Sequence, residues 1–124
     1  MRKQYFFRES MGGLLAWDVD RLIELSASFP RKRVPLSHVR ELDQPWRGDD
    51  DPQTWRSLVA HVRLMDEADL QYPIILAADG TVMDGMHRVA KAVRTGLRDI
   101  EAVQFVEDPP HDLVGQRPED LPYE

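Results

Sequence analysis

The pattern of hydrophobic and polar positions divides the chain into three helical stretches and four short strands. In the first helical stretch, five positions fall on one side at helical spacing: Leu15, Val19, Leu22, Ile23 and Ser26. This spacing predicts a helix from about residue 14 or 18 to residue 28, with Asp18 as a candidate N-cap. Gly12 and Gly13 precede it and separate an N-terminal arm, residues 1–13, from the rest of the chain.

A second apolar stripe predicts the longest helix. Its members recur at i, i+3, i+4, i+7 and i+10 and are Trp55, Leu58, Val59, Val62 and Met65. Asp51 is the expected cap and Pro52 the expected first helical residue, with the helix ending near Asp69. Because Trp55 lies on the stripe, we expect it in the core. Before this helix, residues 34–36 indicate a short edge strand and residues 37–42 one helical turn.

Residues 73–106 carry the clearest strand signals. The continuous apolar run 73–77 is typical of a strand covered on both faces, and Asp79-Gly80 predicts a hairpin turn into a return strand, residues 81–83. A helix is expected from about residue 86 to 95, with Gly96 as its left-handed C-terminal residue, and then a strand over 100–106. Prolines and acids after residue 106 predict a C-terminal tail, 107–124, without regular structure.

This order of elements indicates an α+β fold. Helices and strands alternate irregularly, which favours a small mixed β-sheet with helices packed on it. The length of 124 residues suits one domain, and we place it at residues 14–106, between the arm and the tail.

The amino-acid composition and the net charge exclude several classes of function. The chain contains no cysteine, which excludes disulfides, thiolate metal sites and cysteine nucleophiles. Its formal net charge is −6, so we do not expect the surface as a whole to bind DNA. No apolar stretch is long enough to span a membrane and no signal peptide is evident, so we expect a cytoplasmic protein. The four histidines have no metal-ligand spacing, and no metal site is predicted.

The candidate chemistry lies where the return strand meets the next helix. Gly85 lets the backbone turn sharply there, and the first N–H groups of the helix lack partners within the helix and carry its positive dipole end. Such a corner favours an anion before any side chain is counted. Arg88 adds a planar cation and His87 a donor that titrates near neutral pH. Asp84 is a candidate helix cap, Mg²⁺ ligand or ribose ligand.

The segment 73–92 resembles the core of the ParB/sulfiredoxin superfamily. The shared features are an apolar strand, an Asp-Gly hairpin, a second strand and the motif Asp-Gly-x-His-Arg at the start of a helix. The motif corresponds here to Asp84, Gly85, Met86, His87 and Arg88. The resemblance implies a ParB/sulfiredoxin-like fold that binds a nucleotide or another phosphate-bearing ligand at this corner, with ATP, ADP or CTP and Mg²⁺ as the expected cofactors.

The superfamily includes several activities, and the motif residues of this chain agree with some of them better than with others. Sulfiredoxins carry a cysteine where Met86 stands, so thiol-dependent sulfinic acid reduction is excluded. ParB partition proteins continue into a DNA-binding domain, which we do not expect after the last strand, so sequence-specific DNA binding is not expected either. The motif is more similar to that of free-serine kinases, and the resemblance then implies Asp43, with Glu41 beside it, as the catalytic base and His87 as a further catalytic residue.

Three functions therefore stay open. The first is a nucleotide-binding domain, with nucleotide-dependent phosphotransferase activity as its enzymatic form. The second is a noncatalytic interaction module of a plasmid, phage or partition system, whose arm and tail contact a partner protein or a second copy of the chain. The third, a ParB-like nuclease, is disfavoured by the acidic charge and by the lack of a clear carboxylate pair for two metal ions.

Overall fold

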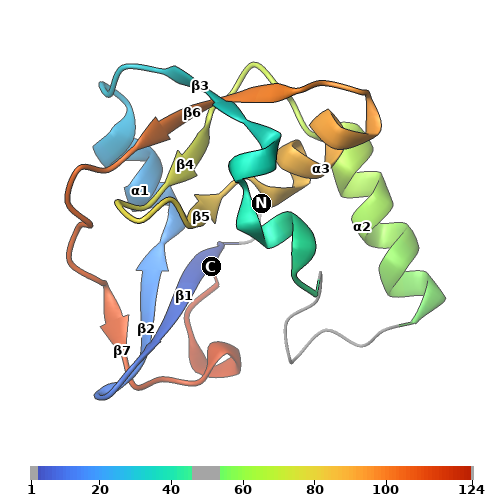
Figure 1. Cartoon of the computed structure of the whole chain (residues 1–124). Helices are drawn as coiled ribbons and strands as arrows, with labels where there is room; N and C mark the ends of the chain where they lie inside the picture. Colours follow the sequence, from blue (N-terminus) through green and yellow to red (C-terminus); the bar gives the residue numbers. More distant parts are fainter. Residues whose placement is uncertain (1–2, 46–53, 124) are drawn as a thin grey trace.

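The computed structural model describes residues 3–45 and 54–123. Within them the chain forms two small β-sheets and three α-helices (Figure 1). In chain order these are β1 (Tyr5–Ser10), β2 (Gly13–Asp18), α1 (Val19–Ser26), β3 (Lys32–Pro35), α2 (Trp55–Glu67), β4 (Ile74–Leu76), β5 (Val82–Asp84), α3 (Met86–Arg94), β6 (Asp99–Gln104) and β7 (Leu113–Val114). The α+β class expected from the sequence is confirmed.

The larger sheet has the strand order β3-β6-β4-β5 and is mixed. β4 runs parallel to β6 and antiparallel to β5, while β3 pairs antiparallel with β6 as an edge strand. The apolar strand, the hairpin at Asp79-Gly80 and the edge strand predicted near residues 34–36 are therefore confirmed. Two 3₁₀ turns, Leu36–His38 and Arg40–Asp43, stand where one helical turn was expected.

The smaller sheet corrects the prediction for the N-terminal region. Residues 13–18 form strand β2, which pairs with β1 in an antiparallel hairpin, so the arm is not a loose extension and the helix does not start at residue 14. α1 begins at Val19, after Asp18, whose side chain accepts a hydrogen bond from the Asp20 N–H at 2.9 Å. The predicted cap is thus right. Gly13 has φ +116°, which only glycine adopts without strain, and it begins β2 directly after the turn at Met11 and Gly12.

The tail also has more structure than the sequence indicated. β7 pairs with β2, a 3₁₀ turn covers Pro118–Asp120, and Leu121 is buried. The Trp17 Nε1–H donates to the Pro109 carbonyl at 2.8 Å, and the Lys3 N–H donates to the Tyr123 carbonyl at 3.2 Å. The prediction of no regular structure after residue 106 is wrong, because β2 offers the tail a free edge with which to pair.

Apolar side chains cover both faces of the larger sheet. One core lies under α3 and consists of Leu36, Val39, Ile74, Leu76, Val82, Val89, Ala92, Ile100 and Ala102. The other lies under α1 and the hairpin and consists of Trp17, Leu22, Ile75, Ala77, Met83, Val103 and Phe105. Alternate residues of β4 thus point to opposite cores, as expected for a central strand covered on both sides.

α2 packs against α3 at the side of the molecule rather than in the core (Figure 1). None of its residues is fully buried, and Trp55 is 83% exposed, so the expected core position of Trp55 is wrong. The helix begins at Trp55, and the Thr54 hydroxyl accepts a hydrogen bond from the Ser57 N–H at 3.0 Å. The expected cap and first residue, Asp51 and Pro52, lie outside the described residues. No helix in the described part is long and apolar enough to cross a membrane.

Candidate functional site

The corner at Asp84–Arg88 is shaped by Gly85. This residue has φ +114°, and a Cβ atom built on it would lie 2.6 Å from Cγ2 of Ile74 and 2.9 Å from Nη2 of Arg88. Because Ile74 is fully buried, it has little room to move. The backbone can therefore pass directly from β5 into α3 only with glycine at this position.

The helix that starts here has an uncapped N-terminus. Gly85 carries no side chain, and no side chain among the described residues caps α3 in its place. The first N–H groups of the helix, those of Met86, His87 and Arg88, have no carbonyl partner within it. Asp84, one of the cap candidates, pairs instead with Arg88, whose Nη2 lies 2.9 Å from its Oδ2, and both side chains are less than one-fifth exposed.

Three hollows meet at the corner, and each has a different chemical character. The arm cavity, of about 480 Å³, lies between the helix N-terminus and the two chain ends, with Lys3, Tyr5 and Tyr123 in its wall. The acidic cavity, of about 410 Å³, lies between α1 and α2. The apolar cavity, of about 470 Å³, lies between α1 and the larger sheet. Asp84 borders all three cavities.

Charge distinguishes the two cavities that reach the helix N-terminus. The acidic cavity is lined by four carboxylates, those of Asp20, Glu67, Asp69 and Asp84, against the single guanidinium of Arg88. In the arm cavity, Asp84 is the one carboxylate among the described lining residues, and Lys3, whose ammonium pairs with Asp18 at 2.8 Å, lies in the wall. An anion that approaches the N–H groups of α3 therefore meets less repulsion from the arm side.

A histidine pair joins α2 and α3 beside the corner. Nδ1 of His61 lies 3.2 Å from Nε2 of His87, and the two rings stack with their centroids 5.5 Å apart. Burial, and secondarily the charge of His61, lower the pKa of His87 below its usual 6.5, while Asp84 opposes this shift. Sequence reasoning missed the pair because the two residues are 26 positions apart on separate helices, and no local spacing links them.

The lowered pKa of His87 has a consequence for stability. Between its folded and unfolded pKa values the unfolded chain binds more protons, so the free energy of unfolding should fall as the pH drops below about 6.5. We expect His87→Gln to reduce this loss, measured by urea unfolding at about pH 5 and about pH 8. His38→Gln, which changes an exposed histidine, is the matched control. An unaltered pH dependence in His87→Gln would contradict the assignment.

The two acids expected as catalytic bases do not join the corner. The Glu41 carboxylate accepts a hydrogen bond from the Val82 N–H at 2.7 Å and so satisfies the outer edge of β5. Asp43 is exposed at the end of its 3₁₀ turn. Neither residue lines the three cavities described above. The structure therefore brings together Asp84, Gly85, Met86, His87 and Arg88 from the predicted set, and it leaves Glu41 and Asp43 apart.

Within residues 3–45 and 54–123, no three His, Cys, Asp or Glu side chains are grouped in a way that could hold a metal ion. No protein-family model, curated protein or solved structure matches the chain.

Proposed function

We propose that this protein binds a phosphate-bearing ligand at the Asp84–Arg88 corner, and that the ligand is a nucleotide. One observation carries the proposal: the N-terminus of α3 has no side-chain cap and opens into the arm cavity. Backbone N–H groups at a helix N-terminus, together with the helix dipole, are a recurrent phosphate site in proteins. Lys3 and His87 border the same cavity and would add donors for the phosphate oxygens.

The walls of the arm cavity support a nucleotide over inorganic phosphate. The rings of Tyr5 and Tyr123 lie 5.5 Å apart in an edge-to-face arrangement, and Phe7 lies beside Tyr5. Aromatic faces of this kind stack on nucleobases with little dependence on the base. The resemblance of residues 73–92 to the ParB/sulfiredoxin superfamily also implies ATP, ADP or CTP. With Mg²⁺ bound to the phosphates, Asp84 is the carboxylate placed to contact the ion.

The proposal concerns binding. The kinase-like role implied for Glu41 and Asp43 has less support, because Glu41 is engaged by the β5 backbone and neither acid faces the corner. A phosphotransferase reaction would instead draw on His87 to exchange a proton, and on the helix N-terminus to stabilise charge. The arm and the tail favoured the interaction-module alternative, and the described parts of both segments contact their own chain.

Binding can be tested with two substitutions expected to act in opposite directions. Arg88→Ala removes a guanidinium and leaves the Asp84 carboxylate unpaired next to the site, so we expect ATP, ADP or CTP to bind about tenfold more weakly or worse. Asp84→Asn removes a negative charge from the site and releases Arg88, so we expect tighter binding in the absence of Mg²⁺, and a smaller gain or a loss when Mg²⁺ is present. Isothermal titration calorimetry with and without Mg²⁺ measures both effects.

Each variant must first unfold cooperatively in a thermal scan, which shows that the fold is intact. Binding of no nucleotide by the unaltered chain, up to about millimolar concentration, would end the proposal. Equal nucleotide affinities in the unaltered chain and in both variants would show that the nucleotide binds away from this corner.

A further inference from the structure

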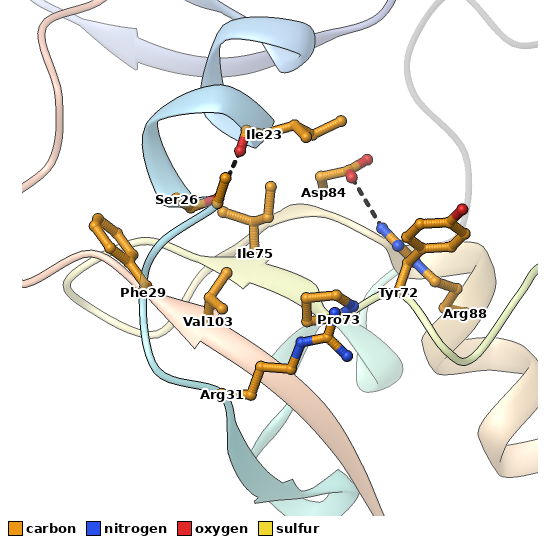
Figure 2. A pocket seen from close by; sticks show the side chains of 11 residues that line it. Ile23, Ser26, Phe29, Arg31, Tyr72, Pro73, Ile75, Asp84, Arg88 and Val103 are labelled. Carbon is orange, nitrogen blue, oxygen red and sulfur yellow. Dashed lines mark hydrogen bonds and ion pairs between the residues drawn. The ribbon is translucent and has the colours of Figure 1, made fainter.

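The apolar cavity has the size of a ligand site. It lies between α1, the face of the larger sheet and the segment that leads into β4 (Figure 2). Its volume of about 470 Å³ falls within the range of roughly 300–1,000 Å³ typical of small-molecule sites. The walls are mostly apolar side chains: Ile23, Phe29, Pro73, Ile75 and Val103. This lining suits the hydrocarbon or aromatic body of a ligand.

Two guanidinium groups border this apolar space. Arg88 is fixed by Asp84, and Arg31 is held by the Gln71 carbonyl at 2.8 Å and by Glu101 at 3.1 Å. Each arginine uses one terminal nitrogen in these contacts, and its remaining N–H groups donate to none of the described residues. In Figure 2 the Arg31 guanidinium lies beside Pro73, and the Arg88 side chain lies beside Tyr72.

The charge of the lining selects the ligand further. Two arginines and one aspartate line the cavity, and each arginine is paired with a carboxylate, Arg88 with Asp84 and Arg31 with Glu101. The guanidinium N–H groups that these pairs leave over favour a ligand with an anionic acceptor, because hydrogen bonds between charged groups are stronger than those to a neutral acceptor. A polyanion such as a nucleotide triphosphate would find no helix N-terminus among the residues that line this space.

We propose that the apolar cavity binds a small monocarboxylate with an apolar body, an aliphatic or aromatic acid. The body lies on Ile75 and Val103, which are almost fully buried at the floor. The carboxylate accepts hydrogen bonds from the unused guanidinium N–H groups of Arg31 and Arg88, a pairing that planar guanidinium groups favour. This site is distinct from the nucleotide site, although Arg88 stands between them.

The proposal is tested with 3-phenylpropionate and its neutral amide, 3-phenylpropanamide, titrated into the full chain by calorimetry. The two probes share one body and differ in the charge of the head group. We expect the carboxylate to bind about tenfold more tightly than the amide, the contribution of a charged hydrogen-bond pair. Arg31→Gln should remove most of that preference. Arg33→Gln should keep it, because Arg33 pairs with Asp99 outside the cavity.

A second substitution tests the location. Ala27 lines the cavity and is exposed at the end of α1, so Ala27→Trp should fill the cavity and abolish binding of both probes while the chain stays folded in a thermal scan. Ile23→Trp, at another half-exposed wall position, replaces it if Ala27→Trp does not fold. Equal affinities for acid and amide, binding that survives filling of the cavity, or no binding at millimolar concentration would each overturn the proposal.

Discussion

Gly85→Ala should lower the free energy of unfolding by about 3 kcal/mol, from two separate penalties. The first is conformational, since φ is +114° at this position and an L-residue with a Cβ atom is strained there. The second is steric, because the new Cβ atom would lie 2.6 Å from Cγ2 of Ile74 in the buried core. Urea unfolding measures the sum as a shift of the midpoint at constant slope.

Gly80→Ala separates these two penalties. Gly80 also has a positive φ, +90°, but a Cβ atom built on it meets nothing within 4 Å. The control should therefore lose only the conformational part, about 1 kcal/mol. If both variants lose the same free energy, the close approach of Gly85 to Ile74 contributes nothing and the backbone path into α3 tolerates a side chain. Loss of nucleotide binding in Gly85→Ala alone would further connect this path to the proposed site.

Trp17→Ala should cost about 4 kcal/mol, because it removes a large buried side chain and leaves a cavity. Trp17 is 3% exposed, and it connects the hairpin to the larger sheet through the core it shares with Ile75 and Val103. Its Nε1–H also fixes the tail at the Pro109 carbonyl. The free energy of unfolding, measured in urea, should fall accordingly, and the segment after residue 106 should become more open to proteolysis.

Trp55→Ala is the matched control, the same substitution at a tryptophan that is 83% exposed. We expect a change within about 0.5 kcal/mol. Trp17→Phe serves if Trp17→Ala does not fold, since it keeps an aromatic ring but loses the hydrogen bond to Pro109, with a cost of about 1–2 kcal/mol. Comparable losses in Trp17→Ala and Trp55→Ala would mean that Trp55 is covered in solution.

The two tryptophans show the limit of periodicity. Trp55 lies on a regular apolar stripe, and the stripe correctly predicted a helix, yet the helix packs at the side of the molecule and leaves this residue in solvent. Trp17 lies between the two helix starts that the sequence left open, residues 14 and 18, and it belongs to strand β2 in the core. A pattern indicates which face of an element is apolar, but it does not measure how much of that face a neighbour covers.

The candidate site also combines features that neighbouring residues predict with features that only the folded chain creates. The Gly85 turn, the start of α3 and the place of Arg88 followed from residues next to one another in the chain, because a strand end, a glycine and a helix start are local events. The histidine pair, the engagement of Glu41 by Val82 and the three cavities involve residues brought together from distant segments. Single-sequence reasoning contains no information on these distances.

The sequence by itself determined the segment from residue 73 to 106, with its strand, hairpin, second strand, helix and final strand. It also determined the α+β class. Turn residues and apolar runs specify helices and strands through neighbours only a few positions away, so the order of these elements can be predicted from the sequence. Only the tertiary structure decided where the N-terminal and C-terminal segments lie. They pair in a second sheet, and residues from both segments line the arm cavity beside the corner. The physical reason is that an unpaired strand edge and an uncovered apolar face are completed by whichever distant segment fits them, and that choice is made in three dimensions.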